Sequence, residues 1–235
     1  MRLFCGFLIL WVSLLLLPVR GWGQVTFSVT YDLAGGGNNV TSFSYNGVEF
    51  AGIEMGNLLK VGIISTSSNN NFRGSNWPLG ATDGSDDFTG AVDLNKYIGF
   101  SIESIPGYTF TVTSIIFGVG RSATGPRQWQ WRGSENSFVD VLEDYGFLPT
   151  GITNESGVLT NPDLNNSWTS IVLFPGIHYE NLTGEAEFRL YGFNAEQEGG
   201  TGGLQGNITI NGYFKPVSGI GEPNSINFDN ASNWT

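Results

Sequence analysis

The sequence predicts an all-β protein, and more narrowly a single two-sheet antiparallel β-sandwich of the jelly-roll type. In several short stretches, apolar and polar residues alternate at a period of two. Clusters of Gly, Asn, Ser and Pro separate these stretches. No stretch keeps a 3.6-residue apolar period for three turns, and the two most helix-like segments, 58–64 and 139–145, are short. Many short strands with turn signals between them are typical of a sandwich or barrel.

The first strand is expected at 25–31, where the odd-numbered positions are apolar and the even-numbered ones are small and polar. A second alternating stretch covers 97–105, Pro106-Gly107 forms a tight turn, and a third stretch runs over 108–119. Five further strands are expected at 128–132, 138–142, 168–174, 186–193 and 206–214.

The N-terminus has the three parts of an export signal. Arg2 supplies the positive charge, residues 3–19 form the apolar stretch, and Gly21 and Gly23 are small residues before a cleavage site. An uncleaved membrane anchor is the alternative, but about 17 apolar residues interrupted by Pro18 are at the short limit for spanning a bilayer. We therefore expect a signal peptide at 1–23 and a protein that is secreted or displayed at the cell surface, with no membrane span in the mature chain.

The remaining chain divides into a β-sandwich domain at 24–214 and a segment at 215–235, which is a linker or the start of a further module. The composition changes to Pro, Gly and Ser after Phe214, as in linkers. The only cysteine, Cys5, lies in the export signal, so the domain has no disulfide and needs a hydrophobic core of its own. We expect a monomeric module.

The chain is strongly acidic, with 10 Lys and Arg against 21 Asp and Glu and a formal charge of −11. Arg2 and Arg20 belong to the export signal, so the mature chain has eight basic side chains and a formal charge of −13. Binding to phosphate groups requires clustered Lys and Arg, and nucleic acid is therefore not an expected partner.

Several motifs follow one another in order: Asp93-Leu94-Asn95-Lys96-Tyr97, Pro106-Gly107-Tyr108-Thr109-Phe110, Arg121-Ser122-Ala123-Thr124-Gly125-Pro126, Trp129-Gln130-Trp131-Arg132, Trp168-Thr169 and Phe188-Arg189-Leu190-Tyr191-Gly192. This series resembles an uncharacterised β-sandwich module of secreted bacterial proteins, both Bacteroidetes proteins with type IX sorting domains and PEP-CTERM-type anchored proteins. The resemblance extends from about residue 24 to 214 and is specific from Asp93 onward. It implies export and a sandwich architecture, and it carries no catalytic residues.

Trp129, Trp131 and Arg132 are the candidate glycan-binding residues. The two tryptophans are two positions apart in an expected strand, so they lie on the same face. Stacking rings beside a guanidinium group would combine contact with a sugar face and recognition of hydroxyl or carboxylate groups. The alternative is that this face is the core, because aromatic residues bury the most area.

Arg121, Arg132 and Arg189 lie in or at the ends of expected strands. They could form a guanidinium cluster for a carboxylated ligand such as a uronic acid. The alternative is that they pair with Asp and Glu and fix the strand register.

Asp83, Asp86 and Asp87 are the candidate calcium ligands. They lie within five residues of an expected loop, and their carboxylates are the hard oxygen ligands that Ca²⁺ prefers. A solvated acidic turn is the alternative, because Asp and Gly are ordinary turn residues. No other cofactor is indicated.

Enzyme activity is not expected. His178 is the only histidine, and no Gly-x-Ser-x-Gly motif accompanies it. The acidic pairs Glu185/Glu187 and Glu143/Asp144 leave a carboxylate-based hydrolase as one alternative. The sequence favours a non-catalytic module with an adhesion or matrix role in a bacterial cell-surface or extracellular protein. The other alternative is a carbohydrate-binding module accessory to polysaccharide degradation, with extracellular polysaccharide as its partner.

Overall fold

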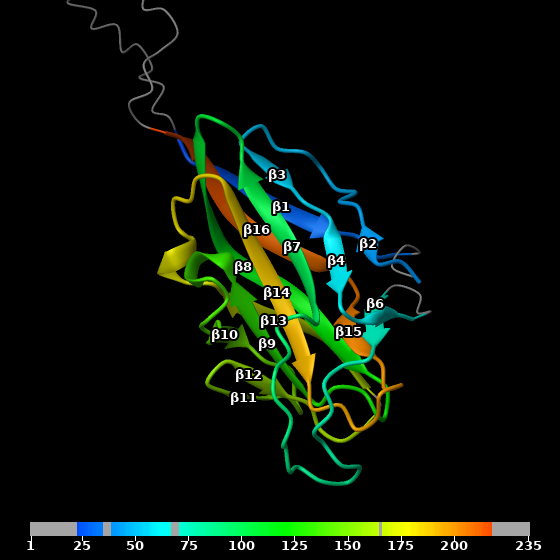
Figure 1. Ribbon diagram of the computed structural model, residues 1–235. Helices are drawn as coiled ribbons and strands as arrows, with labels where there is room; N and C mark the ends of the chain where they lie inside the picture. The colour runs from blue at the N-terminus through cyan, green and yellow to red at the C-terminus, as the bar shows by residue number, and fades with distance from the viewer. Residues whose placement is uncertain (1–22, 35–38, 67–70, 165, 218–235) are drawn as a thin grey trace, which may run out of the picture.

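The computed structural model describes residues 23–34, 39–66, 71–164 and 166–217. These residues form two antiparallel β-sheets packed face to face, which confirms the all-β sandwich (Figure 1). The expected signal peptide, except for its last residue, and the expected linker beyond Val217 lie outside the described residues.

Sheet A has the strand order β1–β16–β8–β15–β6–β5, and β13 pairs with the opposite edge of β8 and with β10. Its strands are β1 (Val25–Tyr31), β5 (Ile64–Ser65), β6 (Asn71–Ser75), β8 (Tyr108–Arg121), β10 (Asp144–Phe147), β13 (Asn166–Phe174), β15 (Gly202–Gln205) and β16 (Ile208–Pro216). The 14-residue β8 pairs with β16 along its first part and with β15 at its end, so it holds the sheet together.

Sheet B has the strand order β11–β12–β9–β14–β7–β4–β2, and β3 pairs with the end of β7. Its strands are β2 (Ser42–Phe43), β3 (Ile53–Met55), β4 (Leu58–Val61), β7 (Tyr97–Ser104), β9 (Gln128–Gly133), β11 (Thr153–Glu155), β12 (Val158–Thr160) and β14 (Glu185–Phe193).

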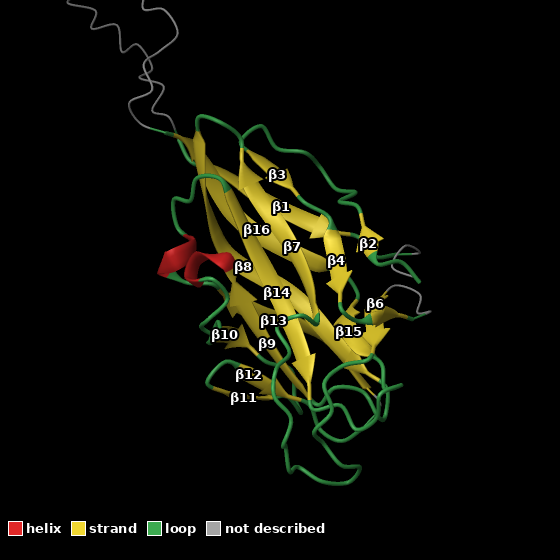
Figure 2. Ribbon diagram, viewed as in Figure 1, coloured by secondary structure: helices red, strands yellow, loops and turns green. Residues whose placement is uncertain are grey.

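Two single-turn 3₁₀ helices, η1 (Ser134–Asn136) and η2 (Ile177–Tyr179), are the helical elements of the described residues (Figure 2). None of the helical structure in this part of the chain is long and apolar enough to cross a membrane.

Most of the expected strands are present. The period-two stretch at 25–31 is β1, with Phe27, Val29 and Tyr31 buried on one face. The tight turn at Pro106-Gly107 joins β7 of sheet B to β8 of sheet A, so the chain crosses between the layers there and does not close a hairpin within one sheet. β16 ends at Pro216, two residues beyond the expected end of the domain at Phe214.

The strand expected at 138–142 is wrong. Ser137 and Phe138 have φ values of 57° and 60°, which turn the backbone out of the extended conformation. The following residues form a loop beside β9, with an isolated bridge between Arg132 and Val141. The apolar segment at 138–142 is therefore a loop, because the backbone bends at Ser137 and Phe138. Neither helix-like segment is helical, since 58–64 contains β4 and 139–145 runs through this loop into β10.

The core lies between the sheets and is rich in aromatic rings. Trp131 on β9 packs edge to face against Phe117 on β8, with 5.3 Å between the ring centroids, and this contact joins the two layers. Phe100 on β7 contacts Trp131 at 6.1 Å and stacks on Phe188 of β14 at 5.4 Å. All four side chains are buried, so the sandwich can be stable without disulfides.

Trp131→Ala should lower the free energy of unfolding by roughly 3–5 kcal/mol, because it leaves a large cavity between the sheets. Phe147→Ala is the control, since Phe147 is 55% exposed and surface substitutions usually change stability by about 0.5 kcal/mol or less. Urea unfolding of both variants checks this. Equal losses would contradict the packing described for Trp131.

Candidate functional site

Two buried arginines lie at the end of the sandwich where the loops gather. Arg121, the last residue of β8, has no exposed side-chain surface. Its guanidinium group donates to Glu196 Oε1 at 2.5 Å and to Asp163 Oδ1 at 3.4 Å. It also donates to the carbonyl oxygens of Ala123, Gly125, Pro162 and Leu164. Arg121 therefore connects three loops and has its donors satisfied.

Arg127 is equally buried and lies six residues further along the chain. It donates to Asp86 Oδ1 at 2.5 Å, to the Ser85 carbonyl at 2.8 Å and to the Asn161 carbonyl at 3.0 Å. Its guanidinium carbon lies 5.2 Å from the ring centroid of Phe88. Arg127 thus holds the loop that contains Asp86 and Phe88 against the body of the domain.

Three carboxylates meet beside these arginines. Asp83, Asp163 and Glu196 each place an oxygen within 4.8 Å of the others; we call this group the acidic cluster. Burial alone would raise the pKa of Asp163, but the Gly84 N–H, which donates to Asp163 Oδ2 at 2.5 Å, and contacts with Glu196, Arg121 and Arg127 lower it below its usual value.

Burial also raises the pKa of Glu196, and the neighbouring Asp163 raises it further, while Arg121 opposes both effects. The two carboxyl groups contact each other, and their pKa values are displaced in opposite directions. Asp163 and Glu196 are therefore a coupled pair of carboxyl groups within the acidic cluster.

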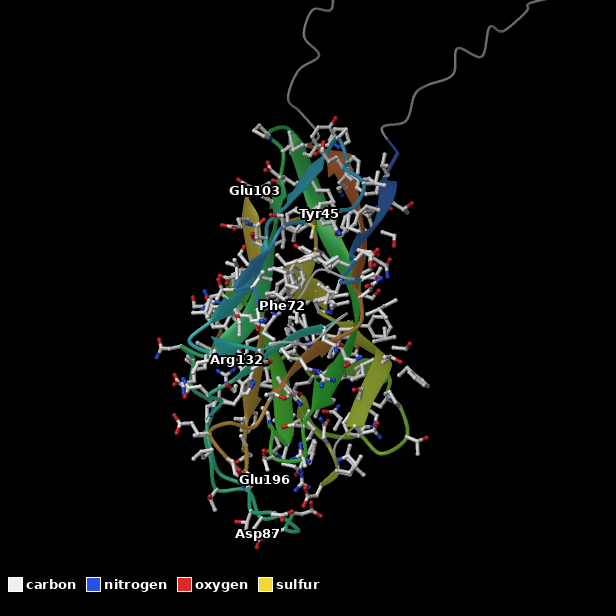
Figure 3. All side chains as sticks on the ribbon, turned by 90° about the vertical axis from the view of Figure 1, so that its right-hand side faces the viewer. Tyr45, Phe72, Asp87, Glu103, Arg132 and Glu196 are labelled. Atoms are coloured by element: carbon white, nitrogen blue, oxygen red, sulfur yellow. The ribbon has the colours of Figure 1, made fainter. Side chains whose placement is uncertain are left out.

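The candidate calcium ligands separate in the structure. Of Asp83, Asp86 and Asp87, only Asp83 belongs to the acidic cluster. Asp86 binds Arg127, and Asp87 is exposed near the tip of the loop, beyond Glu196 (Figure 3). The carboxylates that join Asp83 come from positions 163 and 196, which the sequence analysis did not single out.

Trp129 and Trp131 share one face of β9, as expected from their spacing, but that face is the core. Neither tryptophan has any exposed surface. Trp129 packs against Trp77 at 5.3 Å, and Trp131 packs against Phe117. The proposed stacking platform for sugars is therefore wrong for these two rings, because a buried indole cannot present its face to a polysaccharide.

Arg132 and Arg189 lie opposite each other on β9 and β14, on the outer face of sheet B. Arg132 Nη1 donates to the carbonyl oxygens of Phe138 and Val139, both at 2.9 Å. Arg189 forms two 2.7 Å hydrogen bonds with the carboxylate of Glu187 and lies 3.7 Å from the ring centroid of Phe138. Both arginines fasten the 138–139 loop to the sheet, and Arg121 lies apart in the end cluster. The three do not form one guanidinium site.

A hollow of about 460 Å³ opens at the loop end, next to Arg127 and its partners. Polar groups dominate its lining, and Phe88 is its one aromatic side chain; the lining residues are Asp86, Phe88, Gln128, Gly151, Thr153, Glu155, Thr160, Asn161 and Pro162. A second hollow of about 300 Å³ shares Gln128, Glu155 and Thr160 with the first. Together they form an extended depression across β9, β11 and β12.

Lys60 on β4 is a buried cation that the sequence analysis missed. The residue is 6% exposed, and its Nζ has no hydrogen-bond partner and lies 4.1 Å from the ring centroid of Phe72. Burial lowers the pKa of Lys60 to about 8. Lys60 lines neither of the two hollows, and the burial of its charge without a hydrogen-bond partner lowers the stability of the fold.

In comparisons with protein families, curated proteins and solved structures, the chain has no match.

Arg121→Met should lower the free energy of unfolding by roughly 3–5 kcal/mol, because Glu196 and Asp163 lose the cation that neutralises them. Arg189→Met is the matched control, since the Arg189–Glu187 pair is partly exposed and should contribute about 1 kcal/mol or less. Denaturant unfolding of both variants measures the difference. A loss for Arg189→Met as large as that for Arg121→Met would contradict the structural role given to Arg121.

Lys60→Met should raise the free energy of unfolding at pH 7 by roughly 1–3 kcal/mol. The folded protein binds a proton at Lys60 less readily than the unfolded chain does, so the cost is present below pH 8 and is relieved as the pH rises from about 8 toward 10.5. The difference in melting temperature between variant and wild type should therefore shrink over that range. A difference in melting temperature that stays constant from pH 7 to 10 would contradict the lowered pKa of Lys60.

Proposed function

We propose that this chain is a secreted, non-catalytic β-sandwich module of a bacterial cell-surface or extracellular protein, and that it acts by surface contact. The observation that carries the proposal is how the charged side chains are used. Arg121, Arg127 and Arg189 each bind carboxylates or carbonyl groups of the same chain and hold loops in place. Because these contacts hold the loops in fixed positions, the domain presents a rigid surface to a partner.

The alternative of a carboxylate-based hydrolase needs two free carboxyl groups on either side of a bound sugar. In the pair Glu185/Glu187, both oxygens of Glu187 accept hydrogen bonds from Arg189. The other pair, Glu143 and Asp144, is exposed, and neither residue lines the two hollows at the loop end. These contacts favour the non-catalytic module.

A more specific candidate is a carbohydrate-binding module, and the depression across β9, β11 and β12 favours it. The ring of Phe88 can contact a sugar face, while Gln128, Thr160 and Glu155 supply hydrogen-bonding groups for hydroxyls. Because Asp86 and Glu155 are both acidic, this lining suits a neutral polysaccharide better than a uronic acid.

Phe88→Ala should weaken binding to a neutral polysaccharide by about tenfold, because it removes the one aromatic surface of the hollow. Phe174→Ala is the matched control, since Phe174 is 40% exposed on β13 of sheet A and lines neither hollow. Affinity electrophoresis in gels containing neutral glucans or polyuronates measures both variants.

If wild type is not retarded in any of these gels, the carbohydrate-binding candidate is wrong while the non-catalytic module remains. If wild type releases soluble sugars from the polysaccharides, the non-catalytic proposal itself is wrong. Equal effects of the two substitutions would show that the hollow at Phe88 is not the binding surface.

A further inference from the structure

The acidic cluster has the spacing of a cation site. Its three carboxylates belong to segments far apart in the sequence: Asp83 to the loop before β7, Asp163 to the segment before β13, and Glu196 to the loop after β14. Calcium binds oxygen at about 2.3–2.6 Å, so two ligands on opposite sides of one ion are about 5 Å apart. Because the three oxygens lie within 4.8 Å of one another, a single ion can contact all three.

Glu196 supplies an independent indication. Its side chain is 3% exposed, and its Oε1 is bound by Arg121. Its Oε2 is buried and has no hydrogen-bond donor. The same carboxyl group contacts that of Asp163. A buried, unpaired carboxylate oxygen is costly, and a cation in the cluster would satisfy it.

The charges of the connected groups also leave a place for a divalent ion. Four carboxylates meet here, those of Asp83, Asp86, Asp163 and Glu196, and two guanidinium groups contact them, those of Arg121 and Arg127. With all six groups ionised, the assembly has two uncompensated negative charges. One divalent cation would neutralise it.

We propose that Asp83, Asp163 and Glu196 bind a calcium ion. All three supply hard oxygen ligands from loops, which suits the irregular coordination of Ca²⁺ better than the strict octahedron of Mg²⁺. The ion joins the loop of Asp83 to the segments of Asp163 and Glu196. The same loop provides Asp86 and Phe88 to the wall of the hollow, so calcium also fixes the shape of that wall. The site does not depend on the function proposed above.

Two aspartates of one loop provide a matched test. Asp83 and Asp87 are both exposed, but only Asp83 belongs to the acidic cluster, and no hydrogen bond or ion pair of either carboxylate is found in the described residues. Asp83→Asn should therefore weaken calcium binding at least tenfold without harming the fold, whereas Asp87→Asn should bind calcium like wild type. Isothermal titration calorimetry of chelator-treated protein measures one ion per chain and its affinity.

Calcium should also raise the melting temperature, because a ligand that binds only the folded state stabilises it. At a calcium concentration about 100-fold above the dissociation constant, the rise should be roughly 5–10 °C for wild type and Asp87→Asn. It should be much smaller for Asp83→Asn and Asp163→Asn. Because Asp163→Asn also removes an ion pair with Arg121, its calcium-dependent shift is the relevant quantity and not its melting temperature alone.

Three results would overturn the proposal. The first is no binding heat and no thermal shift for wild type up to about 5 mM calcium, a concentration above the range of extracellular modules. The second is a loss of affinity in Asp87→Asn equal to that in Asp83→Asn. The third is that calcium has no effect while acidification from pH 7 to 5 stabilises wild type but not Glu196→Gln, which would mean that a proton occupies the cluster.

Discussion

The burial of two guanidinium groups at one end of the sandwich determines how the loops there must fold. A buried arginine has five N–H donors and cannot lose its charge, so the surrounding chain has to supply acceptors and negative charge. Arg121 and Arg127 obtain both from loops before β7, before β13 and after β14. The loop end is therefore a connected structure, and a change at one of these contacts affects all three loops.

The same constraint explains the surplus of acid at this end. Carboxylates that neutralise a buried arginine also repel one another. Burial, with a contribution from Asp163, raises the pKa of Glu196, whereas the Gly84 N–H and the contacts with Glu196, Arg121 and Arg127 lower the pKa of Asp163. A backbone donor relieves part of this repulsion, since the Gly84 N–H binds Asp163. It does not reach Glu196 Oε2, which is why a cation is the remaining partner that the geometry suits.

The sequence predicts the all-β sandwich but not the acidic cluster, and the reason is physical. Alternation at 25–31 predicts a strand because the side-chain period is a local property of extended backbone. The spacing of Trp129 and Trp131 predicts a shared face, but only the packing of sheet A on sheet B decides that this face is buried. The acidic cluster could not be found locally, because it joins positions 83, 163 and 196. The available signal was a pair of arginines, Arg121 and Arg127, in a chain with ten basic residues.

The two ends of the sandwich differ in what they can present to a partner. Val25 of β1 pairs with Phe214 of β16, so both ends of the described domain lie side by side, at the end opposite the loops of Asp87 and Glu196 (Figures 1 and 3). A chain attached at either of these two ends would leave the loop end of the sandwich unobstructed. The buried arginines, the acidic cluster and the polar hollow all lie at that free end. Because the arginines and carboxylates fix the loop that carries Phe88, the hollow has a preformed wall, and a ligand would not have to pay the entropy of ordering it.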